Sequence, residues 1–264
     1  MQTDCLSTLT NRDCDITKAI PLYQSPDHQI YWVGTLTSGE EIECNSYLLV
    51  DRGEGYLLEP GGFDRFQPTL DKINSVFSAQ SITHLFFSHQ DPDVCASVAA
   101  WLEFNPQITI VCPSLWKRFM PHYMAYNAKY QPMGDKGITL PLKSGGQLKC
   151  LSAPYLHSPG NMVVFDTMSG YLLSGDIGAS PYSDGETHLV VDGWKMQVDT
   201  MQGFHQRYMS SSRAVAAFIR SVAGMPITAI LPQHGAILRG DEVYKYFQWL
   251  GTLPCGVDYL FPAA

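Results

Sequence analysis

The chain has 264 residues and a formal net charge of −8, with 45% hydrophobic and 16% charged residues. This composition is typical of a globular protein with a substantial core, and an acidic balance without a basic stripe argues against nucleic acid as a partner. The sequence has no apolar stretch long enough to span a membrane and no secretory signal at its start, which favours a cytoplasmic protein. Its seven cysteines form no C-x-x-C pair, so we expect reduced thiols.

The first half of the chain alternates short apolar runs, which predict strands, with segments of helical periodicity. The predicted strands cover residues 29–37, 44–51, 55–62, 82–88 and 107–113. The predicted helices cover residues 65–78, 93–104 and 114–130, the last with Pro121 as a kink or break.

The second half returns to apolar runs before it becomes helical. The predicted strands cover residues 137–143, 146–155, 161–176 and the first part of 226–235. Helices are predicted over about 200–223 and 241–251. Because strands cluster in both halves and helices follow them, we expect two sheets with outer helices. We expect them to form one α/β domain over residues 1–264, with a short polar N-terminal segment.

One short motif concentrates groups that bind metal ions. The run S-H-Q-D-P-D-V places His89, Asp91 and Asp93 at alternate positions, directly after a predicted strand and before a predicted helix. Carboxyl ends of strands are where α/β folds hold ligands, and alternate residues of an extended loop point the same way. A polar turn whose Asp caps the following helix is the alternative interpretation.

Three further residues occupy similar positions. His157, Asp176 and His234 each follow a predicted apolar strand and lie beside glycine or proline. Any one of these residues could be a helix cap or a structural histidine. A potential ligand after a strand occurs four times, counting the His89 motif, and this repetition favours a metal site. Three other histidines lie inside a strand or in aromatic helical segments and are not predicted to bind metal: His84, His122 and His205.

The order H-x-D-x-D, then H, then an Asp after L-L-S-G, then Q-H-G resembles the metallo-β-lactamase superfamily over residues 29–238. Most hydrolases of that superfamily carry H-x-H-x-D-H, whereas this chain has Asp91 and Val94 in place of two histidines. The carboxylate and N-S-Y-L-L at 45–49 resemble the flavodiiron proteins. S-H-Q-D-P-D is closer still to the oxygen-binding diiron proteins, stand-alone relatives found beside bacterial chemotaxis receptors. The resemblance implies a four-layer αββα sandwich.

The same resemblance implies two iron ions in an oxo- or hydroxo-bridged centre. The implied ligands are His89, Asp91 and His157 for the first iron, Asp93 and His234 for the second, and Asp176 bridging both. Replacing an imidazole by a carboxylate hardens the site, which favours iron or manganese over zinc.

Val94 stands where the superfamily pattern has a further histidine ligand. One interpretation is that the second site no longer binds a metal ion, which leaves the protein mononuclear or metal-free. The other is a second iron with three protein ligands and a vacant position beside an apolar side chain, where dioxygen or nitric oxide would bind. We favour the second, because Asp93, Asp176 and His234 are all present. Tyr208 is a further candidate for the ligand pocket.

The resemblance therefore implies a protein that binds dioxygen, or nitric oxide, reversibly and acts as a sensor or carrier for a signalling partner such as a chemotaxis receptor. No glycine-rich phosphate loop opens a helix, so we expect no FMN and no flavodoxin-like domain. An O2 or NO reductase served by a redox partner protein is the alternative, which leaves open whether the chain is an enzyme. Metal-dependent hydrolysis is disfavoured by Asp91 and Val94. Dimers among relatives also imply a homodimer.

Overall fold

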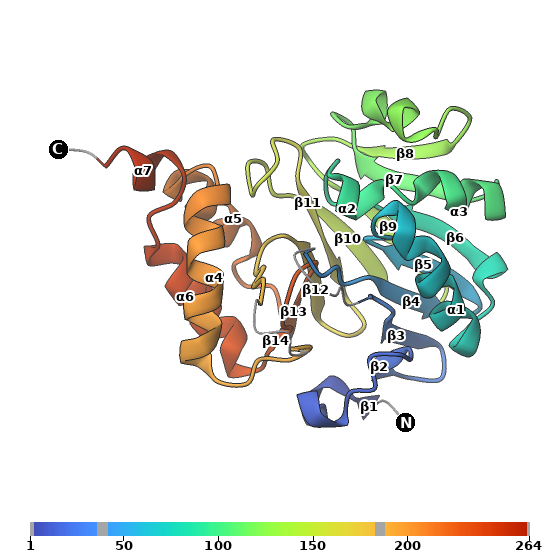
Figure 1. The fold of residues 1–264 in the computed structure, drawn as a ribbon, viewed down its shortest axis with the longest axis horizontal. Coiled ribbons are helices and arrows are strands. Elements are labelled where there is room, and N and C mark those ends of the chain that lie inside the picture. The colour runs from blue at the N-terminus through green and yellow to red at the C-terminus, as the bar shows by residue number, and fades with distance from the viewer. Residues whose placement is uncertain (1–2, 36–41, 183–187, 263–264) are drawn as a thin grey trace.

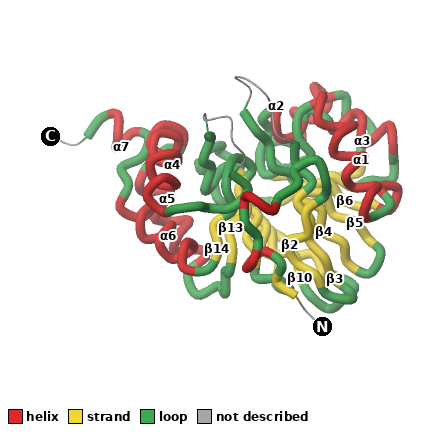
Figure 2. The backbone as a smooth tube through the Cα atoms, turned by 60° about the horizontal axis from the view of Figure 1, so that its bottom comes forward, coloured by secondary structure: helices red, strands yellow, loops and turns green. Residues whose placement is uncertain are grey.

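The computed structural model describes residues 3–35, 42–182 and 188–262, in which two β-sheets lie face to face between helices (Figure 1). The first sheet has eight strands in the order β1 to β8, and the second has six in the order β14-β13-β12-β11-β10-β9. Helices flank the strands on both sides (Figure 2). The four-layer αββα sandwich expected from the sequence is therefore confirmed.

The first sheet is antiparallel from β1 to β5 and parallel from β5 to β8. Its strands are β1 (Thr3–Asp4), β2 (Ile20–Gln24), β3 (His28–Trp32), β4 (Tyr47–Asp51), β5 (Glu54–Leu58), β6 (Ile82–Phe86), β7 (Thr109–Pro113) and β8 (Lys129–Met133). The helices on its side are α1 (Phe66–Val76), α2 (Pro92–Cys95) and α3 (Val98–Phe104).

The second sheet is antiparallel except where β12 pairs with β13. Its strands are β9 (Ile138–Pro141), β10 (Gln147–Ser152), β11 (Met162–Asp166), β12 (Tyr171–Gly175), β13 (Ala229–Pro232) and β14 (Leu238–Arg239). The helices on its side are α4 (Trp194–Tyr208), α5 (Ser212–Val222), α6 (Asp241–Thr252) and α7 (Val257–Leu260).

Three hydrophobic clusters hold the layers together. One lies between the sheets and includes Trp32, Tyr47 and Leu173. A second joins the first sheet to α1 and α3, and a third joins the second sheet to α4, α5 and α6. Because the central strands are buried on both faces, they appear in the sequence as continuous apolar runs without alternation.

A buried ionic link joins the two sheets. The His28 Nδ1 lies 2.9 Å from Asp51 Oδ2, and its Nε2 lies 3.0 Å from Asp166 Oδ2. Burial lowers the pKa of His28, but the hydrogen bonds and charges of Asp166 and Asp51 outweigh burial and raise this pKa above its usual value. Asp51 and Asp166 belong to different sheets, so this histidine ties the inner layers together.

The helix predicted over 114–130 is wrong. The structure has a 3-10 segment, Lys117–Tyr123, and then strand β8. Pro121 lies inside that segment and lacks the N–H of a regular helix, and Met124 ends it in a left-handed conformation with φ of 64°. The aromatic residues of this segment therefore lie in a short 3-10 turn instead of on the face of a long helix.

Two other predicted helices are divided. The helix predicted over 93–104 is α2 and α3, and the helix predicted over 200–223 is α4 and α5. Ser211 separates the latter pair, because its Oγ accepts the Ala214 N–H at 3.2 Å and caps α5. The strand predicted over 29–37 ends at Trp32, and residues 36–37 lie outside the described residues. No helix in the described part of the chain has the length and apolar character to cross a bilayer.

Strand directions bring particular chain ends to one edge of the sandwich. β4 is antiparallel to β5, and β5 is parallel to β6, so the start of β4 lies beside the ends of β5 and β6. β10 and β12 are both antiparallel to β11, and β12 is parallel to β13, so these three end together. The loops that follow β6, β10, β12 and β13 carry the predicted metal ligands.

Candidate metal centre

The motif after β6 forms an extended loop that leads into α2. Asp91 occupies the N-cap position of this short helix with an extended backbone, but its side chain makes no capping hydrogen bond. The carboxylate turns towards two histidines, with Oδ2 3.5 Å from His89 Nε2 and 3.4 Å from His157 Nε2. A helix cap therefore does not explain this carboxylate.

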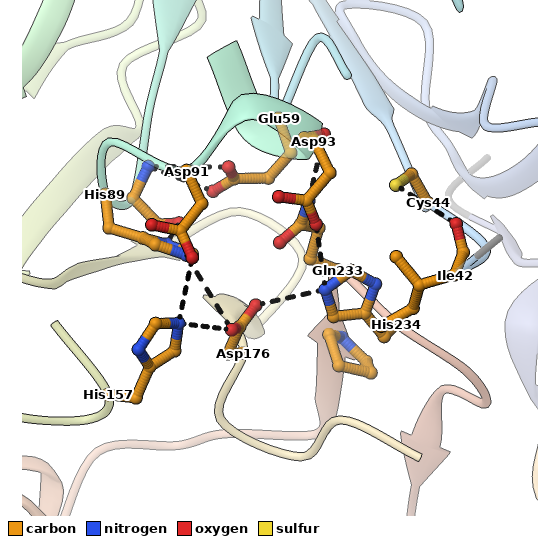
Figure 3. Close-up of polar contacts among 12 residues, drawn as sticks. Ile42, Cys44, Glu59, His89, Asp91, Asp93, His157, Asp176, Gln233 and His234 are labelled. Atoms are coloured by element: carbon orange, nitrogen blue, oxygen red, sulfur yellow. Dashed lines mark hydrogen bonds and ion pairs between the residues drawn. The ribbon is translucent and has the colours of Figure 1, made fainter. Parts of the chain in front are cut away.

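The first half-site consists of His89, Asp91 and His157 (Figure 3). One ligand atom from each lies within 4.8 Å of the other two. His89 is almost fully buried, whereas Asp91 and His157 are half-buried. The two imidazoles meet edge to face, with ring centroids 4.8 Å apart. This convergence gives two imidazole nitrogens and one carboxylate around a single point.

The second half-site contains Asp93 and His234, with Asp93 Oδ2 3.3 Å from His234 Nε2. Asp176 lies between the two half-sites (Figure 3). Its Oδ2 lies 2.9 Å from His157 Nε2, and its Oδ1 lies 3.5 Å from His234 Nε2. Each carboxylate oxygen of Asp176 thus faces a different half-site. All six residues predicted from the sequence come together here.

Hydrogen bonds on the far side of the rings orient two of the imidazoles. The His234 Nδ1–H donates to the Glu43 carbonyl at 2.7 Å, and His89 Nδ1 lies 2.8 Å from Ser88 Oγ. Both partners leave Nε2 free to face the carboxylates. Metal-bound histidines are held by the same kind of outer contact, which fixes the tautomer and the ring orientation.

The electrostatics of the cluster couple histidines to carboxylates. Burial lowers the pKa of His157, but the hydrogen bonds and charges of Asp176 and Asp91 outweigh burial and raise this pKa to about 9. Burial raises the pKa of Asp176, but the neighbouring histidines, His89 first, outweigh burial and lower this pKa to about 2. The histidines therefore stabilise the ionised form of Asp176, and the carboxylates stabilise the protonated form of His157.

Three residues beside the metal centre were not predicted from the sequence as part of it. The Gln233 Nε2–H group donates to the Asp93 carbonyl at 3.1 Å and to its carboxylate at 3.3 Å. Glu59, directly after β5, accepts the Ser88 N–H at 3.2 Å, and burial raises its pKa to about 7. Cys44 lies in the second half-site. Glu59 lies inside the strand predicted over 55–62, whereas β5 ends at Leu58, so the strand-end rule would have found Glu59 only with the shorter strand.

Other predicted positions surround the centre. Tyr208 stacks on Phe204 with ring centroids 4.5 Å apart and meets His157 edge to face at 5.7 Å. Val94 is fully buried and belongs to the hydrophobic cluster beneath α1 and α3. Its role beside an open metal position stays a prediction.

The histidines that were not predicted as ligands lie outside both clusters found among the described residues. His84 stacks on Tyr56 at 5.2 Å, and His122 is exposed. His205 is fully buried on α4, where its Nε2 accepts the Gly178 N–H at 3.1 Å and its Nδ1–H donates to the Met201 carbonyl. These contacts give His205 a structural role beside the Asp176 loop.

The donor set fits a pair of metal ions. The Asp176 Oδ1 is buried and accepts no hydrogen bond from any described residue, although it faces the second half-site. A buried carboxylate oxygen without a donor is costly unless a cation compensates it. Two imidazoles with one carboxylate, as in His89, His157 and Asp91, form a ligand set typical of non-haem ferrous iron.

Comparison with known proteins finds one matching family model and similar solved structures. The family model described as ODP family beta lactamase matches residues 42–235. A solved structure of the apo state of the chemotaxis sensor ODP from T. denticola is 37% identical, has a TM-score of 0.83, and covers 92% of this chain and 97% of that chain. A second solved structure, the peroxy diiron species of chemotaxis sensor ODP, is 35% identical with a TM-score of 0.83, covering 92% and 98%.

The curated relatives are more distant and much longer. Diflavin flavoprotein A 1 of Synechocystis is 26% identical over 219 residues, which cover 78% of this chain and 36% of that protein. The chain therefore spans about a third of the length of this relative.

Proposed function

Because the chain belongs to the ODP family of β-lactamase-fold proteins, we propose that it is a non-haem diiron protein that binds dioxygen reversibly and serves as an oxygen sensor. Reduced iron supplies the chemistry of dioxygen binding, and the protein supplies the ligands, their orientation and the surrounding charge. The proposal extends to a signalling partner, because the two solved relatives are described as a chemotaxis sensor.

The observation that carries the proposal is the position of Asp176. Its two oxygens face separate half-sites, at 2.9 Å from His157 Nε2 and 3.5 Å from His234 Nε2. A carboxylate in this position can bridge two cations and neutralise part of their mutual repulsion. An ordinary salt bridge between one acid and one base would not require a second, oppositely placed histidine. This arrangement supports a binuclear centre.

The ligand types support iron as the metal. Three imidazoles and three carboxylates give a harder donor set than the histidine-rich sites of zinc hydrolases. We assign His89, Asp91 and His157 to one iron, Asp93 and His234 to the other, and Asp176 to both. Asp91 replaces a neutral ligand by an anionic one, which stabilises the higher charge of oxidised iron.

Ligand number supports reversible binding. Val94 follows Asp93 and has no donor atom, so the second iron receives fewer ligands from this motif than a histidine at that position would allow. An incompletely coordinated ferrous ion can accept a small diatomic ligand. Tyr208 and Phe204 cover the neighbouring histidines with aromatic surface, and a phenol such as that of Tyr208 can donate a hydrogen bond to a ligand.

The proposed setting is the cytoplasm. All seven cysteines are free thiols, which are typical of a reducing compartment. The proposed partner is a chemotaxis receptor or a comparable signalling protein that responds to the state of the centre.

The test is an anaerobic titration of the iron-loaded, reduced protein with dioxygen, followed by optical absorption and metal analysis. We expect two irons per chain and a new visible absorption band that disappears when dioxygen is removed. Rapid oxidation without a reversible band would overturn the sensor proposal in favour of a reductase that needs an electron donor. Failure to bind iron would overturn the diiron assignment itself.

A further inference from the structure

Cys44 lies in the second half-site, beside Asp93 and His234. Its Sγ, a carboxylate oxygen of Asp93 and a ring nitrogen of His234 all lie within 4.8 Å of one another. Cys44 is 5% exposed, and its Sγ–H donates to the Ile42 carbonyl at 3.7 Å (Figure 3). We infer that the Cys44 thiolate is a further protein ligand of the second metal ion, an inference that rests on the proposed diiron function.

The backbone around Cys44 is fixed against the loop that carries His234. The Glu43 carbonyl accepts the His234 Nδ1–H at 2.7 Å, and the Asn45 N–H donates to the Gln233 carbonyl at 2.6 Å. The Asn45 Nδ2 also donates to the Gly235 carbonyl at 2.8 Å. Cys44 thus lies between Glu43 and Asn45, which both form hydrogen bonds with the loop that carries His234. These contacts keep the Cys44 backbone beside the imidazole of His234.

A second observation points to a ligand at this place. The Asp176 Oδ1 is buried, faces His234 and accepts no hydrogen bond from the described residues. The first half-site has two imidazoles and one carboxylate, whereas the second has one imidazole and Asp93 before Cys44 is counted. Val94 provides no donor here. The thiolate gives the second half-site three protein ligands of its own, as many as the first half-site has, and an octahedral ferrous ion with these ligands and the shared Asp176 still has positions open for dioxygen.

Coordination by Cys44 requires the loss of a proton. The S–H bond breaks, the sulfur–metal bond forms, and one proton leaves for each thiol that binds a divalent cation. The sulfur donor makes the second half-site softer than the first. The two metal positions therefore differ in chemistry, with oxygen and nitrogen donors in one and a mixed set with sulfur in the other.

Cobalt(II) provides a direct test, because a thiolate bonded to this ion gives an intense near-ultraviolet charge-transfer band. The apo protein, Cys44→Ala, Cys44→Ser and the control Cys112→Ala are titrated anaerobically with Co2+. Cys112 is a fully buried cysteine in β7, within the cluster beneath α1 and α3, so its variant controls for the loss of a buried thiol.

We expect wild type and Cys112→Ala to show the band as the second cobalt binds. Both Cys44 variants lose the band and bind the second Co2+ at least about tenfold more weakly, while they retain the first. Circular dichroism identifies any variant that fails to fold, and Cys44→Ser provides a second, nearly isosteric variant.

Two cobalt ions per wild-type chain without a thiolate band, or a band that persists in folded Cys44→Ser, would overturn the ligand assignment and leave the binuclear centre intact. Fewer than two cobalt ions per wild-type chain would instead count against the binuclear centre on which this inference rests.

Discussion

Replacing His28 by leucine is expected to destabilise the fold without removing the metal centre. His28, Asp51 and Asp166 are all fully buried, and the imidazole lies within 3.0 Å of a carboxylate oxygen of each aspartate. The substitution leaves two buried carboxylates without their shared cation. Removing one member of a buried ion pair costs about 3–5 kcal/mol of the free energy of unfolding.

Both aspartates keep other hydrogen bonds in His28→Leu, so the expected loss of unfolding free energy lies near the lower end of this range. Asp51 still accepts the Ser144 N–H at 2.9 Å, and Asp166 still accepts the Ser169 N–H at 3.0 Å. We therefore expect a loss of about 3 kcal/mol, which corresponds to a decrease in Tm of roughly 6–12 °C for a domain of this size. The iron content should not change, because Asp51 ends β4 and the metal centre lies beside the start of β4.

The assay is urea denaturation of wild type, His28→Leu and the matched control His84→Leu, followed by circular dichroism. His84 stacks on Tyr56, so its loss should cost only about 0.5–1.5 kcal/mol. Equal destabilisation by the two substitutions would refute the claim that the link between the sheets is ionic.

The pH dependence gives a second readout. Since the folded-state pKa of His28 is raised, its stabilising contribution is fully present below the unfolded value of 6.5 and is lost as the pH rises through the folded pKa. The difference in unfolding free energy between wild type and His28→Leu should therefore be larger at about pH 6 than at about pH 9. A difference that grows with pH would contradict this sign.

Three further predictions concern the metal centre. His89→Ala and Asp176→Ala should each lose iron from at least one half-site, and two irons per chain by metal analysis in either variant would show the ligand assignment wrong. Val94→His should add a ligand to the second iron and weaken dioxygen binding in an optical titration; unchanged affinity with the histidine coordinated would contradict an open position. Tyr208→Phe should lower dioxygen affinity by roughly 2–10-fold if the phenol donates a hydrogen bond, and faster dissociation in stopped-flow measurements would accompany it.

The ligand residues were predictable because they obey a local rule. His89, Asp91, His157, Asp176 and His234 each follow a strand whose apolar run is visible in the sequence. Strands that end at one edge of a sandwich bring such residues together, and the fold does so here. Their roles as metal ligands remain a prediction of that pattern.

Cys44 could not be found in this way. It precedes β4, so it reaches the same edge from the opposite chain direction, and its partner His234 is 190 residues away. The prediction of a helix over 114–130 was wrong for a different reason. It followed the periodicity of the aromatic residues and treated Pro121 as a kink or break within a helix, whereas Pro121 lies in a short 3-10 segment. Both errors concern features that tertiary contacts or backbone geometry decide.

The measurement that tests the central claim most directly is electron paramagnetic resonance of the oxidised protein after anaerobic iron loading. If Asp176 and an oxo or hydroxo group bridge two irons, the ferric ions couple antiferromagnetically, and the account predicts little ferric signal although metal analysis finds two irons per chain. A full-intensity signal from isolated high-spin ferric ions would contradict a bridged centre, and with it the proposed mode of dioxygen binding.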